Sequence, residues 1–325
     1  MKLVFCGTPQ FAVPTLQALI AAGHEIALVV SQPDRPVGRS QVLTAPPVKQ
    51  TALAAGLEVT QPEKIKNNPE FRERLEAIAP DAIVVVAYGR MIPPWMLSLP
   101  RLNHPTDPEK PVGAPKGCIN LHASLLPKYR GAAPIQWAVA MGETVTGNTT
   151  MLLEEGLDTG PILLQQEIPI APGQSAAELF DVMAKTGAPL VVKTLAGLDE
   201  GTIAPMQQDH SHATFAPILT REDGRMDFAK HTARELWNRW RGFQPWPGAY
   251  TNLEGKKLIV HRMQVSQKIG AAEPGSVEIA DGAMLVACAQ GTWIEIIELQ
   301  LEGKKRMAAS EFLRGAALRS GVRLG

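Results

Sequence analysis

Two arrangements of apolar residues divide the chain. Over residues 1–203, short continuous apolar runs alternate with segments of helical periodicity. Continuous runs are typical of strands buried on both faces, and helical periodicity is typical of the helices that cover them. Strands are predicted at residues 2–6, 26–30, 58–60, 81–87, 118–122, 147–154 and 162–170, and helices at 9–22, 48–55, 71–78, 132–141 and 175–197. This alternation predicts an α/β domain with a mostly parallel sheet.

The last third of the chain has a different pattern of apolar and polar residues. A helix is predicted at 232–241, and short strand candidates separated by turn residues follow at 249–253, 257–265, 275–279, 284–287 and 292–301. Short strands at this spacing favour a small β-barrel. Residues 204–216 are polar and lack a period, so we expect a domain at 1–203, a linker at 204–216 and a barrel domain at 217–325.

Two segments are rich in proline. Residues 32–47 hold four prolines together with Arg35 and Arg39, and a loop of that length inside a compact domain is usually functional. Residues 103–116 also hold four prolines, and we expect a surface insertion without a chemical role. The opening strand–helix–strand is Rossmann-like, but no glycine occurs between Gly7 and Gly23, so the G-x-G-x-x-G signature of dinucleotide sites is absent.

The most informative stretch begins at the strand of residues 118–122. Because side chains alternate along a strand, Asn120 and His122 point to the same face, where the strand gives way to a loop. Open α/β sheets bind ligands at the carboxyl ends of their strands. Asn120 could donate to an oxyanion, and His122 could carry a proton near neutral pH. A capped strand end with a structural histidine would give the same pattern.

A carboxylate further along completes the candidate site. Asp158 lies between Gly156 and Gly160, in a loop whose backbone can approach a ligand closely, and it could orient His122. An ordinary aspartate-containing turn has the same composition. His210 and His212 with Asp209 have no further ligand at a useful spacing, so no metal site is predicted.

Composition limits the function classes. The chain has 325 residues, 45% of them hydrophobic, and three cysteines that lie far apart, which fits free thiols in a reducing compartment. No apolar run approaches the ~20 residues of a membrane span, and the opening strand leaves no room for a targeting segment, so a cytoplasmic protein is expected.

Net charge is zero, but residues 217–325 carry +4 and residues 1–216 carry −4. The basic second part suggests contact with nucleic acid, although chance could produce this difference.

The candidate site resembles the signature of the folate-dependent formyltransferases. Asn120-x-His122, the loop Ser124–Pro127 and the run 157–160 carry this resemblance. Further segments are similar to the branch that formylates methionyl-tRNA, and they span most of the chain: residues 7–12, 32–36, 86–90, 129–136 and 243–247. The resemblance implies a Rossmann-like formyltransferase domain followed by an OB-like barrel that binds tRNA.

The resemblance also implies a reaction and its participants. A formyl group would move from 10-formyltetrahydrofolate to the amine of methionyl initiator tRNA, without a metal and in a monomer. Asn120, His122 and Asp158 would be catalytic. The folate would contact Ser124, Leu125, Leu126, Pro127, Met91 and Ile92, and the tRNA would contact Arg39, Lys304, Lys305 and Arg306.

The chain departs from the family pattern at two places, and two other functions stay open. Ser40, Gln41 and Val42 stand where Gly-Lys-Lys is usual, which removes two positive charges, and the insertion at 103–116 is unusual. A formyltransferase acting on a small free amine, such as an amino sugar or glycinamide ribonucleotide, would share residues 1–200. A non-catalytic tRNA-binding protein would share the fold but would be expected to lose part of the catalytic set.

Overall fold

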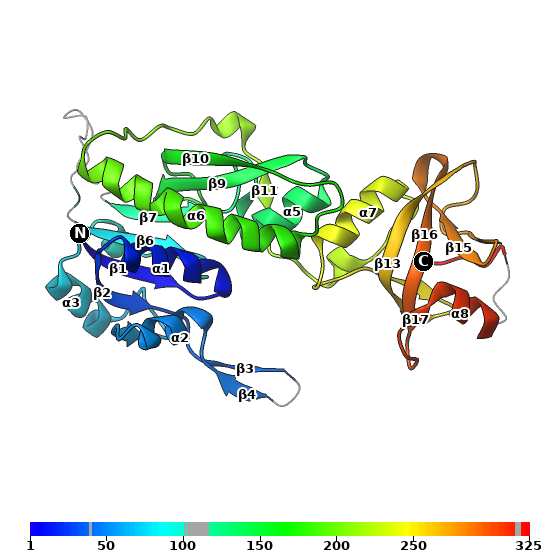
Figure 1. The fold of residues 1–325 in the computed structure, drawn as a ribbon, viewed down its shortest axis with the longest axis horizontal. Coiled ribbons are helices and arrows are strands. Elements are labelled where there is room, and N and C mark those ends of the chain that lie inside the picture. The colour runs from blue at the N-terminus through cyan, green and yellow to red at the C-terminus, as the bar shows by residue number, and fades with distance from the viewer. Residues whose placement is uncertain (39–40, 101, 103–116, 316–319) are drawn as a thin grey trace. The chain divides into compact units, whose positions relative to one another are not determined.

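The computed structural model describes residues 1–38, 41–100, 102, 117–315 and 320–325 (Figure 1). Arg39 and the insertion at 103–116 therefore lie outside the described residues. The chain forms two compact units. The first unit comprises Met1–Pro134, Val145–Pro169 and Phe180–Pro217, and the second comprises Ile135–Thr144, Ile170–Leu179 and Ile218–Gly325.

The first unit is built on a seven-stranded sheet of order β10-β9-β7-β6-β1-β2-β5. Strands β7, β6, β1, β2 and β5 run parallel, whereas β9 pairs antiparallel with both β7 and β10. Their bounds are β1 Lys2–Gly7, β2 Glu25–Val30, β5 Val59–Thr60, β6 Ala82–Val86, β7 Cys118–His122, β9 Val145–Leu152 and β10 Ile162–Pro169. Every residue of β6 and β7 is buried, as expected of central strands covered on both faces.

The helices begin and end at recognisable signals. Helix α3 starts after Asn68, whose side chain accepts a hydrogen bond from the Phe71 N–H, and α6 starts after Ser175, which forms a capping box with Glu178. Several of these helices also carry proline in the first turn, where no N–H partner is needed. The helices are α1 Val13–Ala21, α2 Pro47–Ala54, α3 Pro69–Ile78, α4 Pro94–Leu97, α5 Pro134–Ala140 and α6 Ala176–Asp199.

Helix α6 fixes which face of β7 carries the candidate residues. Gly187 of α6 comes so close to Leu121 of β7 that a Cβ at this glycine would lie 2.7 Å from a Leu121 methyl group. Phe180 of α6 also packs edge-on against Phe11, with ring centroids 5.1 Å apart. Because side chains alternate along β7, Asn120 and His122 point to the face away from α6.

The segment expected to be an irregular loop at 32–47 contains regular structure. Its described residues form an antiparallel ribbon of β3 Arg35–Val37 and β4 Val42–Thr44. Gly38 and Gln41 both take a positive φ, and the Gln41 N–H donates to the Gly38 carbonyl. The many prolines concealed this pairing in the sequence, because proline normally interrupts strands.

The second unit is organised by an antiparallel sheet of order β12-β13-β16-β15-β14, with β17 added to β16. Buried side chains of β13, β15 and β16 form its core together with α7 and α8. Helix α7 begins with a capping box between Thr232 and Glu235. The bounds are α7 Ala233–Gly242, β12 Tyr250–Leu253, β13 Lys256–Ile269, β14 Val277–Ala280, β15 Ala283–Ala287, β16 Thr292–Leu301, β17 Met307–Ala308 and α8 Ala309–Gly315.

The predicted fold class is confirmed. The first unit is an α/β unit with a mostly parallel sheet, and the region beyond it forms a separate antiparallel sheet. Within the described residues, no helix combines the length and the apolar character that crossing a bilayer requires.

Candidate active site

Strand β7 holds the two central side chains of the site. Asn120 is opposite Val85 of β6 and Met151 of β9, and His122 is opposite Thr149 of β9. Both side chains are largely buried, with 9% and 6% of their surface exposed. The Asn120 carboxamide makes no side-chain hydrogen bond to another described residue, so its N–H groups remain available to a ligand.

One hydrogen bond of the His122 ring decides which ring nitrogen carries the proton in its neutral form. Its Nε2 lies 2.9 Å from the carbonyl oxygen of Tyr129. A carbonyl can only accept, so this nitrogen carries a proton and donates. In the neutral ring the lone pair is therefore on Nδ1, which lies 3.7 Å from Oδ2 of Asp158. The unprotonated nitrogen of the neutral ring therefore faces the Asp158 carboxylate.

Asp158 is held in place by the loop after the histidine strand. Its Oδ2 accepts a hydrogen bond of 2.8 Å from the N–H of Gly131. Asp158 has a φ of 50°, a left-handed conformation that is unusual for a residue other than glycine. Such a backbone conformation costs on the order of 1–3 kcal/mol of folding free energy and persists only where surrounding contacts enforce it. The contacts that enforce it come from a distant part of the chain.

Gln208 supplies those contacts, and no pattern in the sequence pointed to it. Its Nε2 donates to the carbonyl oxygens of Asp158 and Gly160, at 2.8 and 2.7 Å. Its Oε1 accepts from Arg130, at 2.6 and 3.2 Å. Gln208 is buried, although it lies in the polar segment expected to be a linker. A lone glutamine in such a segment has no signature in sequence, because its partners lie 48 to 78 residues away.

Arg130 is a buried cation beside this loop. Only 4% of its surface is exposed, and its guanidinium donates to two side chains: Gln208, and Nδ1 of His210 at 2.9 Å. Because the guanidinium can only donate, Nδ1 of His210 is the acceptor in this contact. The short strands β8 Arg130–Gly131 and β11 Phe215–Ala216 pair here, so residues 206–216 are tied into the first unit.

The candidate folate residues form a rigid loop after β7. Ser124 Oγ donates to the Lys128 carbonyl, and the Leu126 carbonyl accepts from Gln165. The Leu126–Pro127 peptide is cis. Ser124 and Leu126 are buried, whereas Leu125 and Pro127 are partly exposed. The two hydrogen bonds hold the backbone of this loop in place.

Met91 and Ile92 follow the carboxyl end of β6. The Met91 side chain is 70% exposed, and Ile92 is partly buried against the core. The loops after β1, β2 and β6 are joined at the Tyr88 carbonyl, which accepts from Thr8 at 3.0 Å and from Gln32 at 3.2 Å. These hydrogen bonds fix the loop that carries Met91 at the same edge of the sheet as the end of β7.

The candidate tRNA residues lie elsewhere. Lys304, Lys305 and Arg306 are exposed in the turn that joins β16 to β17, and Arg306 forms an ion pair with Glu298. The structure does not describe Arg39. Within the described part of the chain, the three catalytic candidates are therefore brought together, and the basic run is in the second unit.

Comparison with known proteins identifies the family. Residues 1–106 and 108–195 match the family Formyl transferase, and residues 218–317 match the family Formyl transferase, C-terminal domain. This chain belongs to the formyl transferase family.

Full-length relatives of this family member carry a more specific name. A methionyl-tRNA formyltransferase of Acidobacterium capsulatum is 65% identical over 325 residues, which is all of both chains. A protein of the same name from Koribacter versatilis is 54% identical and is covered over 99% of its length.

Solved structures of distant relatives share the fold. The sugar 3N-formyl transferase WlaRD, determined with dTDP and 5-N-formyl-THF, is 17% identical with a TM-score of 0.62, covering 94% of this chain and 99% of that one. An N-formyltransferase of Helicobacter canadensis, in complex with folinic acid and dTDP-3-aminofucose, is 16% identical with a TM-score of 0.63, covering 91% and 98%.

Proposed function

We propose that this family member transfers a formyl group from 10-formyltetrahydrofolate to the α-amine of methionyl initiator tRNA, in the cytoplasm. The observation that carries the proposal is the 65% identity over both full lengths with a methionyl-tRNA formyltransferase. The position of Asn120 and His122 at the end of β7, with the Asp158 carboxylate 3.7 Å from His122, supports it, because a non-catalytic descendant would have no reason to keep all three.

The proposed reaction needs an oxyanion donor and a proton carrier. The neutral amine attacks the formyl carbon, and the carbonyl oxygen becomes an oxyanion that accepts from the Asn120 carboxamide. The attacking nitrogen loses a proton to Nδ1 of His122, and Asp158 stabilises the imidazolium at a distance of 3.7 Å. The proton then passes to the folate nitrogen as its bond to the formyl carbon breaks.

The remaining candidates bind the two substrates. Ser124, Leu125, Leu126 and Pro127, together with Met91 and Ile92, contact the folate at the carboxyl edge of the sheet. Solved relatives with folate derivatives bound support a folate co-substrate for this fold. Arg39, Lys304, Lys305 and Arg306 contact the tRNA.

One acceptor panel tests the proposal. Purified protein with 10-formyltetrahydrofolate is offered methionyl initiator tRNA, methionyl elongator tRNA, free methionine and an amino sugar nucleotide, and formylated product is measured. We expect strong preference for the initiator tRNA. Preference for the amino sugar would replace the proposed acceptor, and binding of tRNA without any transfer would indicate a non-catalytic protein.

A further inference from the structure

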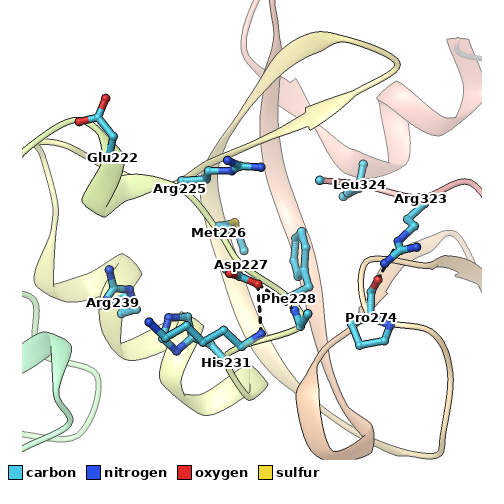
Figure 2. Close-up of a pocket in the computed structure, with 13 residues that line it drawn as sticks. Glu222, Arg225, Met226, Asp227, Phe228, His231, Arg239, Pro274, Arg323 and Leu324 are labelled. Atoms are coloured by element: carbon cyan, nitrogen blue, oxygen red, sulfur yellow. Dashed lines mark hydrogen bonds between the residues drawn. The ribbon is translucent and has the colours of Figure 1, made fainter.

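The second unit contains a cleft that the proposed reaction does not use (Figure 2). It offers a ligand little apolar surface, because Met226 and Phe228, which line it, are each only 4% exposed. The first unit contains a buried cation that the proposed reaction also leaves unused. This cation is the Arg130 guanidinium, and hydrogen bonds through Gln208 join it to Asp158.

Arg130 is buried without a carboxylate partner. Only 4% of its surface is exposed, and no carboxylate among the described residues forms an ion pair with it. Burying a charge costs folding free energy, which an ion pair would partly offset. The contribution of this guanidinium to the site therefore comes from the direction in which its N–H groups donate.

The Arg130 guanidinium donates to two acceptors. Its Nε and Nη2 donate to Oε1 of Gln208, at 3.2 and 2.6 Å, and Nη2 also donates to Nδ1 of His210 at 2.9 Å. Gln208 is buried and His210 is exposed. Of the two, only the Gln208 side chain also donates to the Asp158 loop within the described residues.

The chemistry of these groups allows one orientation of the Gln208 amide. A guanidinium can only donate, and a carbonyl oxygen can only accept. Oε1 of Gln208 therefore faces Arg130, while Nε2 donates to the Asp158 and Gly160 carbonyls at 2.8 and 2.7 Å. A reversed amide would place donor against donor on one side and acceptor against acceptor on the other, so Arg130 opposes that reversal.

Asp158 is held at both its backbone and its carboxylate. Its carbonyl accepts from Gln208, and its Oδ2 accepts from the N–H of Gly131 at 2.8 Å. Gly131 directly follows Arg130, and both belong to β8, which pairs with β11. One dipeptide thus fixes Asp158 directly through Gly131 and indirectly through Arg130, and together these contacts hold its left-handed backbone, with a φ of 50°.

We propose that Arg130 is a positioning residue for formyl transfer and acts through Gln208. By fixing the orientation of the Gln208 amide, it holds the Asp158 backbone so that the carboxylate stays 3.7 Å from Nδ1 of His122. The inference rests on the proposed function, in which Asp158 and His122 act together. It adds a residue that touches neither substrate nor the reacting atoms.

A set of four variants of the full-length protein tests this role. Methionine in Arg130→Met has a similar length but no donor, and it is compared with Gln208→Ala and with the double variant. The control is His210→Ala, which removes the other acceptor of the same guanidinium and leaves the contacts to the Asp158 loop in place. Formylation of methionyl initiator tRNA gives kcat and KM, measured well below the unfolding temperature of each variant.

Arg130→Met should lower kcat about three- to tenfold with KM near that of the parent, because the hydrogen bonds that orient the Gln208 amide are lost. In the Gln208→Ala background the same change should alter kcat by less than about twofold, because residues that act through one another are not additive. His210→Ala should keep the kcat of the parent. An equal loss from Arg130→Met in both backgrounds would show that Arg130 acts independently of Gln208 and would overturn the proposal.

Arg130→Lys serves if the methionine variant does not fold. Its ammonium keeps the positive charge, but it lacks the planar fork that donates to Oε1 from two nitrogens. The kcat should fall about threefold while Gln208 is present and should hardly change in the Gln208→Ala background. A fall of the same size in both backgrounds would again contradict the role through Gln208.

Hydrogen exchange at the Gly131 N–H measures the position of Asp158 without any reaction. This N–H donates to Oδ2 of Asp158, so its exchange should become faster in Arg130→Met and in Gln208→Ala, but not in His210→Ala. NMR of the full-length protein measures these rates. Faster exchange in His210→Ala to the same degree would mean that any change around Arg130 loosens this region, and the assigned path through Gln208 would be wrong.

Formylation by the unsubstituted protein is measured in parallel. Absence of transfer to initiator tRNA would refute the proposed function, and exchange at Gly131 would still decide whether Arg130 holds Asp158. Normal transfer together with unaltered kcat and unaltered Gly131 exchange in Arg130→Met would refute only the positioning role.

Discussion

The two units present functional groups in opposite ways. In the first unit, His122, Asp158 and Gln208 are largely buried and joined by contacts between residues far apart in the chain. In the second unit, Lys304, Lys305 and Arg306 are consecutive, exposed and held by a turn. A cluster of buried polar side chains is held in one geometry, because a buried polar group without a hydrogen bond costs free energy of folding. Exposed cationic side chains can adopt many conformations.

This difference predicts that substitutions in the two units change different properties of the protein. Chemistry at a developing charge needs polar groups fixed to within a fraction of an ångström, and the first unit holds Asp158 in this way through the Gly131 N–H and Gln208. Attraction of a polyanion needs only charge at the right surface. Substitutions in the first unit should therefore reduce turnover, and substitutions in the second should reduce affinity in a salt-dependent way.

The largest effect is expected at the catalytic candidates. Asn120→Ala, His122→Ala and Asp158→Ala should each reduce the rate of formyl transfer by about 10²-fold or more, because an oxyanion donor is worth ~10²–10³ and a proton carrier ~10²–10⁴. Single-turnover transfer to methionyl initiator tRNA measures this step. Because the three act together, the double and triple variants should lose little more than the worst single one.

The control for these variants is affinity for tRNA. It should stay near that of the parent protein, since none of the three residues belongs to the basic surface of the second unit. Nearly unchanged turnover in His122→Ala would remove the histidine from the mechanism and leave its hydrogen bond to Tyr129 as a structural contact.

These residues also show which parts of the site are predictable from sequence. Asn120 and His122 could be placed on one face because strand alternation is a local rule. The distance between His122 and Asp158 could not be predicted, because it depends on the Gly131 N–H and on the left-handed backbone at Asp158. Gln208 was missed for the same reason, since both of its acceptor partners belong to a loop about fifty residues earlier. The pairing of β3 with β4 was not predicted, because the prolines in this segment indicated a loop more strongly than its other residues indicated strands.

A second effect is expected at Arg39, whose role stays a proposal because it lies outside the described residues. Arg39→Ala should reduce transfer to initiator tRNA about 10–100-fold, the range that corresponds to a charge-assisted hydrogen bond of ~1.5–3 kcal/mol. Arg39→Lys should not restore activity, because an ammonium cannot grip phosphate in bidentate fashion. Kinetics that are the same for both variants and the parent would remove Arg39 from the tRNA site.

Substitutions at Gln208 test whether the buried contacts around Asp158 serve the reaction. Gln208→Ala should lower kcat about tenfold with little change in KM, and should also lower the unfolding temperature, because four hydrogen bonds of roughly 1 kcal/mol each are removed. Gln208→Glu keeps an acceptor for Arg130 but loses both donations to the Asp158 loop.

The glutamate variant separates positioning from stability. Its new carboxylate can pair with the buried Arg130 guanidinium, so the unfolding temperature should recover most of what alanine loses. The kcat should stay low, because the Asp158 and Gly160 carbonyls now face an acceptor. Recovery of kcat together with stability would mean that Gln208 supports the fold only.

The smallest effect is expected in the basic turn. Lys304→Ala with Lys305→Ala should weaken tRNA binding by about threefold and flatten its salt dependence by up to ~0.9 for each phosphate that is no longer neutralised, with kcat unchanged. Arg306→Ala should do less, because the Arg306 guanidinium already pairs with Glu298 and is therefore less available to a phosphate. Binding titrations at several salt concentrations distinguish these variants. A larger salt effect from Arg306 than from the two lysines would mean that the ion pair opens when RNA binds, so that even this exposed surface has a defined geometry.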